Sequence, residues 1–342
     1  MRSHISAKTL RRLASVGALT SLACALAGCS GSPGDSDTRT LRAGVIYAPS
    51  VAIVRCGLDP LADDERLSDV GIEIQTTDSA QLGSEDELIQ QASTGELDIA
   101  LAAGSTLATE FGIPELEMFE AYYLYETVED VSRARNSEIG QEVWGRLPDE
   151  ANLQPVGDPW LYGERHIFGN EALREPEDFK GVKFRVPETD ISIASARALG
   201  ASPTPIAYAE LYLGLQQGIV DVAEAPLNVI KAESFDEPSS YINLTGHLIT
   251  AASPLINNDA WTSLSSEQRD VVTTALGEAS QRVADCVAED DEKALAEWKE
   301  AGDLEVVDDV DKEALRSLAE EAYSQGQPWS ESYKLLLKEL HG

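Results

Sequence analysis

The sequence predicts an α/β protein that is built as two lobes. The chain has 342 residues, which is long enough for two lobes with a core each. Hydrophobic residues make up 43% of it, with modest glycine and proline, which is typical of a globular chain and not of a disordered one. Strand and helix patterns alternate along the sequence, and this spacing predicts a mostly parallel sheet covered by helices.

Residues 1–29 have the pattern of an export signal. A basic start precedes an apolar run at 13–26, which is too short and too rich in small residues to span a membrane comfortably. The run ends in Leu-Ala-Gly-Cys, which resembles the lipobox of bacterial lipoproteins, where the cysteine is diacylated and becomes the first residue. We therefore predict lipidation at Cys29, followed by a flexible tether at 30–40. An ordinary signal with an incidental Cys29 is the alternative, and Arg11-Arg12 leaves both Sec and twin-arginine export open.

The first half of the remaining chain alternates between short strands and helices. Strands are expected at residues 41–47, 72–76, 97–102, 153–160 and 165–168, the last two separated by Gly163. A helix is expected at 84–93, because Ser84 is a good N-cap and acidic residues fill the first turn. Two or three more helices are expected within 127–147.

A β-α-β pattern occupies residues 178–224. It consists of a strand at 182–186 stopped by Pro187, a helix at 189–199 ended by Gly200, an extended crossing with Pro203 and Pro205, a helix at 208–217 and a strand at 219–222. Arg185 lies near the end of the first of these strands, beside a helix N-terminus. Ligands of open α/β sheets lie at the carboxyl ends of strands, and a guanidinium suits a carboxylate. We therefore predict that Arg185 binds a carboxylate.

The last third of the chain is mainly helical. Strands are expected at 247–252 and 255–257, returning to the first lobe. A long helix follows from Ser265 to about residue 300, opened by a Ser-Ser-Glu-Gln start signal. It is long enough to cross both lobes, and two acidic helices follow it.

Composition argues against several classes of function. The formal net charge is −34, and the basic leader makes the remainder more acidic still, so nucleic-acid binding by a broad basic surface is disfavoured. The four histidines are too scattered for a zinc site. The sequence contains no Gly-x-Ser-x-Gly, no phosphate-binding glycine loop and no Cys-x-x-Cys. We therefore expect no metal, no cofactor and no enzymatic activity, and a monomer.

Several motifs in order resemble the solute receptors of tripartite ATP-independent periplasmic (TRAP) transporters, the family of the dicarboxylate- and sialate-binding receptors. They are DFKGVKFRVP at 178–187, LGASPTPIAYAELY at 199–212, LQQGIVDVAE at 215–224, and the shorter matches QLG at 81–83 and GELD at 95–98. The resemblance implies a two-lobed periplasmic-binding-protein-like fold, with two mixed sheets flanked by helices, hinge strands and the long helix crossing both lobes. Lobe I would comprise 41–162 plus 251–290, and lobe II 163–250 plus 291–342.

The resemblance also implies a ligand site. Arg185 matches the family arginine that holds the ligand carboxylate in a bidentate pair, and Arg165 matches one that commonly adds a second contact. Tyr208 matches a position where the family often places an aromatic ring against the ligand. Tyr47, at the end of the first strand, and Trp160, near the lobe crossing, are ligand candidates by placement alone.

Two departures from the family pattern bear on the ligand. Sugar-acid receptors carry asparagine after the glutamate that matches Glu224, where this chain has Ala225. They often carry asparagine after Arg-Val-Pro, where this chain has Glu188. Ala225 removes a hydrogen-bonding arm and opens space for an apolar group. Glu188 is expected either to pair with Arg165 or to face a cationic or hydroxyl group of the ligand, so sialate itself is disfavoured.

Two cysteines remain once Cys24 has left with the signal and Cys29 has been lipidated. In an exported protein the remaining pair, Cys56 and Cys286, favours a disulfide, with two free buried thiols as the alternative.

These observations predict a lipid-anchored receptor that closes on a small organic acid by hinge motion. Closure would shut out water and strengthen the pairing between arginine and carboxylate. The closed form would then dock with integral-membrane transporter subunits. A ligand-sensing subunit of a signalling system is the alternative binding function. A secreted hydrolase is a weaker alternative, because no nucleophile–base pair can be identified.

Overall fold

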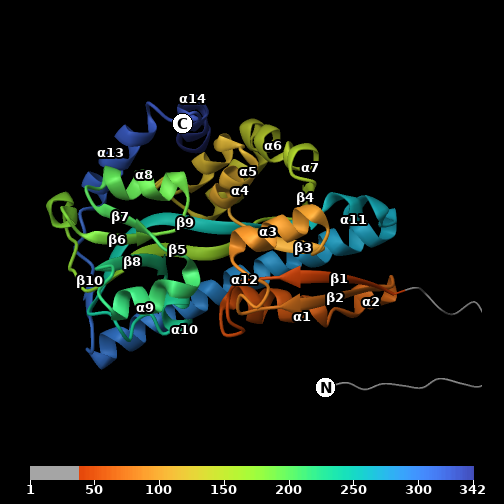
Figure 1. Ribbon diagram of the computed structural model, residues 1–342, viewed down its shortest axis with the longest axis horizontal. Coiled ribbons are helices and arrows are strands. Elements are labelled where there is room, and N and C mark those ends of the chain that lie inside the picture. Colours follow the sequence, from red (N-terminus) through yellow and green to blue (C-terminus); the bar gives the residue numbers. More distant parts are fainter. Residues whose placement is uncertain (1–37) are drawn as a thin grey trace, which may run out of the picture. The chain divides into compact units, whose positions relative to one another are not determined.

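A ten-stranded mixed sheet runs through residues 38–342, the part of the chain that the computed structural model describes (Figure 1). Its strands are β1 (Arg39–Gly44), β2 (Ile72–Thr77), β3 (Ile99–Ala102), β4 (Leu153–Pro155), β5 (Trp160–Gly169), β6 (Lys183–Val186), β7 (Ser202–Pro205), β8 (Val222–Pro226), β9 (Tyr241–Asn257) and β10 (Glu305–Val307). Their order is β2-β1-β3-β9-β5-β8-β6-β7, and β4 and β10 also pair with β9. The leader, Cys29 and most of the predicted tether lie outside the described residues.

Two long antiparallel strands, β5 and β9, join the two ends of this sheet. The first part of β9 pairs with β5 and β10, and its last residues pair with β3 and β4. The sequence predicted two strands here, but β9 is continuous through Pro254. Proline lacks the N–H that a central strand uses, yet the Pro254 carbonyl accepts a hydrogen bond from the Val156 N–H at 3.0 Å. The strand therefore continues across the position where the prediction ended it.

A break was also predicted at Gly163, which instead lies inside β5 at a bulge. Its φ of 130° is in the range that favours glycine. A Cβ at this position would come within 2.8 Å of the Pro226 Cβ, so the close approach of β5 to β8 also requires glycine.

Helices cover both faces of the sheet and bury two hydrophobic clusters. One cluster includes side chains of α3 (Glu85–Thr94), α4 (Gly104–Phe111), α5 (Val128–Asn136), α6 (Glu138–Trp144), α8 (Asp190–Ala198), α13 (Lys312–Tyr323) and α14 (Ser330–His341). The other includes side chains of α1 (Asp59–Ala62), α2 (Glu65–Asp69), α9 (Leu211–Gln216), α10 (Leu227–Ala232), α11 (Asn258–Ser263) and α12 (Ser266–Ala301). The short α7 (Leu147–Glu150) precedes β4. Each cluster contains residues from both predicted lobes, so the clusters do not divide the chain at the predicted lobe boundaries. Those boundaries remain a prediction.

Alternation along β3 shows how the sheet separates these two clusters. Ile99 and Leu101 belong to one cluster, and Ala100 and Ala102 to the other. Successive side chains of a strand point to opposite faces. A strand buried on both faces is therefore apolar throughout, which is the pattern that the sequence shows at this place.

The long helix predicted from Ser265 is α12, and its length is confirmed. A capping box joins Ser265 and Gln268 at its start, and Gly302 ends it in the left-handed conformation. Near its start it contacts α2, where Arg66 pairs with Glu278. It therefore reaches from elements beside β1 and β2 to elements beside β8 and β10 (Figure 1).

The two C-terminal helices pack over the cluster that contains α3 and α4. α13 lies against α8 and β9, while α14 lies against α5 and the 3₁₀ turn Pro114–Glu120. Trp329, just before α14, donates its indole N–H to Glu117 at 2.9 Å. The tail that was grouped with lobe II thus contacts residues from the range predicted for lobe I.

Two element boundaries differ from the predictions. β1 begins at Arg39, inside the predicted tether, because the Arg39 N–H donates to the Gly71 carbonyl at 2.8 Å. β8 begins at Val222 and not at Ile219, whose side chain is 51% exposed in the preceding turn. The strand therefore extends through Pro226, which places Glu224 and its neighbour within the sheet.

A disulfide joins Cys56 to Cys286, as predicted. Cys56 lies in the π-helix Ile53–Leu58 and Cys286 lies in α12, so the bridge ties the first helical segment to the late long helix. The two cysteines are 230 residues apart in the sequence, so their bridge restricts the unfolded chain strongly.

Replacing both cysteines with serine is expected to lower the free energy of unfolding by about 2–4 kcal/mol. Urea unfolding of the wild type and the double variant measures this difference. Reducing the wild type should bring its unfolding midpoint close to that of the variant, and reduction of the variant should change nothing. Labelling of both thiols in unreduced, denatured wild type would contradict the bridge.

Candidate functional site

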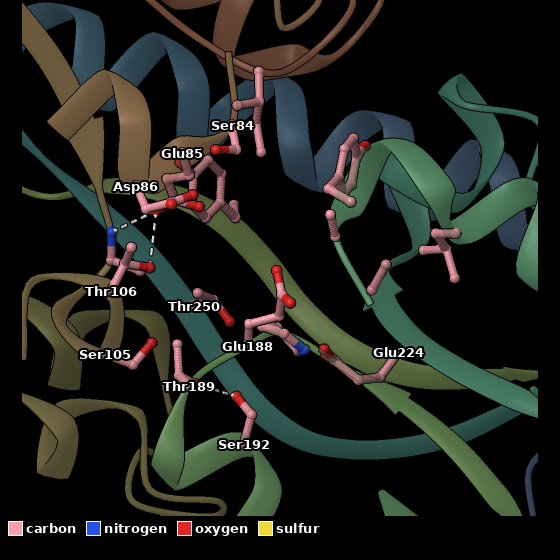
Figure 2. Close-up of a pocket in the computed structure, with 18 of the residues that line it drawn as sticks. Ser84, Glu85, Asp86, Ser105, Thr106, Glu188, Thr189, Ser192, Glu224 and Thr250 are labelled. Carbon is pink, nitrogen blue, oxygen red and sulfur yellow. Dashed lines mark hydrogen bonds between the residues drawn. The ribbon is translucent and has the colours of Figure 1, made fainter. Parts of the chain in front are cut away.

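A cavity of about 450 Å³ opens among β5, β6, β8 and β9 on one side and the starts of α3 and α4 on the other. This volume lies within the range of small-molecule sites. Figure 2 shows Glu188 and Thr189, which follow β6, and Glu224 from β8, on the same cavity as Glu85 from α3 and Thr106 from α4. The site therefore brings together segments from widely separated parts of the chain.

Seven of the eight predicted ligand-binding residues line this cavity: Tyr47, Arg165, Arg185, Glu188, Tyr208, Glu224 and Ala225. Trp160 does not line it. Its side chain is fully buried, and its indole N–H donates to the Leu276 carbonyl of α12 at 3.1 Å. A Cβ at Gly57 would come within 2.6 Å of its ring, which shows how tightly the indole is packed. Trp160 is therefore a core residue that fastens β5 to α12.

Arg185 is buried at the wall of the cavity. Its side chain is 3% exposed, and Nε and Nη2 both donate to the Ile206 carbonyl, at 2.9 and 2.6 Å. Burial lowers the pKa of Arg185 to about 10, so it stays cationic at neutral pH. No carboxylate among residues 38–342 forms an ion pair with Arg185. Because a guanidinium has five N–H groups, Arg185 still has free donors that could bind an anion in the cavity.

Arg165 has a different partner from the one considered in the sequence. Its Nε and Nη2 bond to the two carboxylate oxygens of Glu224, the second at 2.8 Å, and Nη2 also donates to the Glu224 carbonyl at 3.1 Å. Arg165 thus pairs with Glu224 and not with Glu188. Burial alone would raise the pKa of Glu224, but Arg165 and His247 outweigh it and bring the pKa down to about 2.

His247 lies behind this pair, and sequence reasoning gave it no role. It is fully buried, and its Nδ1 shares a hydrogen bond of 2.8 Å with the Thr245 hydroxyl. Its Nε2 lies 3.8 Å from Glu224 Oε2, and its ring meets Tyr122 at 4.5 Å between centroids. Burial lowers the pKa of His247. Nε2 has no hydrogen-bond partner among the described residues, so the imidazole borders the Arg165–Glu224 pair without bonding to it.

Four further carboxylates line the wall and were not identified from the sequence: Glu85, Asp86, Glu110 and Glu120. Glu85 accepts hydrogen bonds from the Ala103 N–H and the Thr106 hydroxyl, both at 3.3 Å (Figure 2). Glu120 accepts from the Ser105 N–H at 3.0 Å and the Ser105 hydroxyl at 2.7 Å. Burial raises the pKa of Glu85 to about 7 and also raises that of Glu120.

The start of α3 held a signal for Glu85 that sequence reasoning used only for helix capping. The acid that closes the capping box is Glu87, which accepts from the Ser84 N–H at 2.9 Å. Glu85 is therefore free of that task, and its side chain faces the cavity (Figure 2). The first turn of α3 holds three acids, Glu85, Asp86 and Glu87, and the capping box uses only Glu87.

Aromatic rings form another part of the wall. The ring of Tyr47 meets those of Tyr162 and Tyr208, with 5.2 Å between centroids in both cases. Tyr208 also packs edge-on against Phe235 at 5.8 Å. The cavity thus combines two arginines, several carboxylates and a group of tyrosines, which suits a small polar ligand with an apolar part.

The sequence and the fold match known proteins along most of the chain. Residues 63–327 match the family described as bacterial extracellular solute-binding protein, family 7. The sialic acid-binding periplasmic protein SiaP of Vibrio cholerae is 31% identical over 277 residues, which are 78% of this chain and 84% of SiaP. A TRAP periplasmic solute-binding protein from Ochrobacterium anthropi with bound L-fuconate is 26% identical, with a TM-score of 0.81, and 88% of this chain covers 99% of that one.

A second solved structure has the same fold, but at 24% sequence identity the likeness supports the fold and not a shared ligand. It is a TRAP periplasmic solute-binding protein from Roseobacter denitrificans with bound 3-deoxy-D-manno-oct-2-ulosonic acid. Its TM-score is 0.82, and the match covers 89% of this chain and 99% of that one.

Proposed function

Because this chain belongs to the bacterial extracellular solute-binding proteins of family 7, we propose that it binds a small organic acid in the cavity beside Arg185 and delivers it to TRAP-type membrane subunits. The family match and the similarity to SiaP confirm the resemblance to TRAP receptors that the sequence motifs indicated. The proteins of this family are solute receptors that act outside the cytoplasm. Sialic acid, in the name of the Vibrio relative, and L-fuconate, in the Ochrobacterium structure, are both organic acids.

The observation that carries the proposal is the state of Arg185. Its guanidinium is buried and cationic, and its only bonded partner among the described residues is a neutral carbonyl. Burying a charge without an opposite charge is unfavourable, and a carboxylate from the ligand would supply that charge. Nη1 and the second N–H of Nη2 remain for such a contact.

Arg165 would have a supporting role at the same site. Glu224 already accepts from Nε through its carboxylate and from Nη2 through both its carboxylate and its carbonyl, so mainly Nη1 remains for a ligand. This pair fixes the position of the charge in the wall but contributes little net positive field. Arg185 is therefore the main anion-binding residue, and Arg165 adds at most a second contact.

The proposal is tested by identifying the acid that the protein carries. Native mass spectrometry of protein purified from its own host, followed by calorimetric titration with the compound found, should show one organic acid bound per chain. Binding only of uncharged compounds would contradict the proposal. So would the failure of a broad panel of sugar acids, dicarboxylates, keto acids and amino acids to bind.

We also propose that lipidated Cys29 anchors the receptor to the outer face of the cell membrane. The support is the Leu-Ala-Gly-Cys lipobox at the end of an apolar leader. Within residues 38–342, no helix has the length and apolar character needed to cross a bilayer. Two acyl chains on one cysteine would give durable attachment.

Replacing Cys29 with serine is expected to release the receptor from membranes, because the thiol that carries the lipid is lost. Fractionation of cells that produce the wild type or the variant measures this, with Cys24→Ser as the control within the leader. The control should remain in the membrane fraction. A Cys29→Ser protein that still sediments with salt-washed membranes would show that the anchor is not a lipid on this residue.

A further inference from the structure

We propose that the ligand carries a positive charge as well as a carboxylate, and that the Glu85 and Glu120 carboxylates form a subsite for that cation. This inference rests on the proposed function, because it takes Arg185 as the carboxylate end of the cavity. The ligand class is therefore a zwitterion, such as an amino acid or a betaine.

The first step is the balance of charge in the cavity wall. Six carboxylates line the cavity, against two guanidinium groups: Glu85, Asp86, Glu110, Glu120, Glu188 and Glu224 against Arg165 and Arg185. Arg165 and Glu224 pair with each other, which leaves Arg185 as the unpaired cation of this lining; of the other acids, Glu85 and Glu120 are partly buried, while Asp86 and Glu188 are exposed to solvent. A ligand with only a carboxylate would add negative charge to a wall that is already negative, whereas a zwitterion would not.

The second step is the state of the two inner acids. Within residues 38–342, Glu85 and Glu120 accept hydrogen bonds from neutral N–H and hydroxyl groups, and neither forms an ion pair. These donors fix the orientation of both carboxylates toward the same cavity (Figure 2 shows Glu85 and Ser105). Burial without a cation is unfavourable for both groups, and a bound ammonium would remove that penalty.

The third step concerns an independent polar group in the cavity wall, the hydroxyl of Thr250. The Thr250 side chain on β9 is 4% exposed, and its hydroxyl has no hydrogen-bond partner among the described residues. Figure 2 shows this hydroxyl directed into the cavity that Glu188 and Ser105 also line. An unpaired buried hydroxyl is destabilising, so its place in this wall indicates that a polar atom of the ligand completes it.

The tyrosines favour an organic cation with apolar substituents. Aromatic faces attract alkylated ammonium groups, and Tyr47, Tyr162 and Tyr208 bring three rings to the same cavity. A metal ion is a poorer match, because no group of three or more His, Cys, Asp or Glu side chains in residues 38–342 is placed to hold one. A polyhydroxylated acid is the remaining alternative, since carboxylates also accept hydrogen bonds from hydroxyls.

Calorimetric titration of the whole mature receptor with matched ligand pairs tests the inference. One member of each pair is a trimethylammonio carboxylate with one to five methylene groups. The other replaces the nitrogen with carbon, which keeps the shape as a tert-butyl acid but removes the charge. L-Fuconate and 3-deoxy-D-manno-oct-2-ulosonic acid represent polyhydroxylated acids.

We expect at least one zwitterion to bind about tenfold or more tightly than its tert-butyl partner, equivalent to about 1.4 kcal/mol. Glu120→Gln and Glu85→Gln should each reduce this ratio, while Glu292→Gln, an exposed α12 residue, should leave it unchanged. Melting temperatures of the variants check that they are folded, and the comparison of wild-type ligand pairs does not depend on any variant.

Each other outcome has a distinct meaning. If tert-butyl or polyhydroxylated acids bind as tightly as every zwitterion or more tightly, the cation subsite is wrong and the proposed receptor function stands. If the zwitterion preference survives in both glutamine variants, the subsite is not formed by these acids and the inference is also overturned. If no carboxylate of any class binds, the proposed function itself fails.

Discussion

Arg185→Ala is expected to weaken ligand binding by roughly 30- to 4,000-fold, because it removes the buried cation that would face the ligand carboxylate. Removing one partner of a buried charge pair costs on the order of 2–5 kcal/mol, which corresponds to that range. Arg185→Lys keeps the charge but loses the planar fork, so its affinity should lie between those of the wild type and the alanine variant. Calorimetric titration of all three proteins with the identified acid measures the series.

The structure adds an expected effect on stability that the sequence did not suggest. The Ile206 carbonyl accepts from both Nε and Nη2 of Arg185, so alanine leaves this acceptor without those donors. The melting temperature of the ligand-free variant should therefore fall modestly. Arg174→Ala is the matched control, because Arg174 is a surface arginine that pairs with Glu305 and Asp309.

The control should bind the ligand as the wild type does. Equal affinities of the wild type and Arg185→Ala would remove Arg185 from the ligand site. If Arg185→Ala does not fold, the lysine variant still decides the question, because it retains the charge and differs in geometry. A lysine variant that folds and binds like the wild type would show that the guanidinium fork is not needed.

Glu224→Gln is expected to lower the free energy of unfolding by about 3–5 kcal/mol, because it leaves the Arg165 guanidinium in the interior without its anion. The two side chains are 4% and 13% exposed, so water cannot replace the lost charge fully. Glu305→Gln, which removes an exposed partner of Arg174, should change stability by about 1 kcal/mol or less. Urea unfolding at pH 7 measures both variants.

A second substitution distinguishes the cost of an unpaired buried charge from other effects of changing Glu224. Arg165→Met in the Glu224→Gln background removes the stranded charge, so it should recover part of the lost stability. The pKa of Glu224 is lowered to about 2, so the pair stabilises the protein fully above about pH 4.5 and progressively less as the pH falls toward 2. Unchanged stability of Glu224→Gln at pH 7 would show that Arg165 does not depend on this carboxylate.

The elements that the sequence predicted well are those specified by neighbouring residues. Ser84 as an N-cap followed by acidic residues predicted the start of α3, and the Ser-Ser-Glu-Gln signal at Ser265 predicted the start of α12. Such signals act within one turn of a helix, so they can be identified without knowing what packs nearby. The disulfide could also be predicted from the sequence, because an exported chain with two remaining cysteines leaves one possible pair.

By itself, the sequence determined the α/β class, the receptor family and Arg185 as the main candidate for the anion site, because motif order and local periodicity survive without coordinates. Only the tertiary structure decided which acid pairs with Arg165, that Trp160 is a core residue, and that Glu85 and Glu120 share a cavity with Arg185. Arg165 and Glu224 are 59 residues apart in the sequence and meet because β5 and β8 are adjacent. Pairings of this kind depend on how distant segments pack, and no spacing within one segment encodes them.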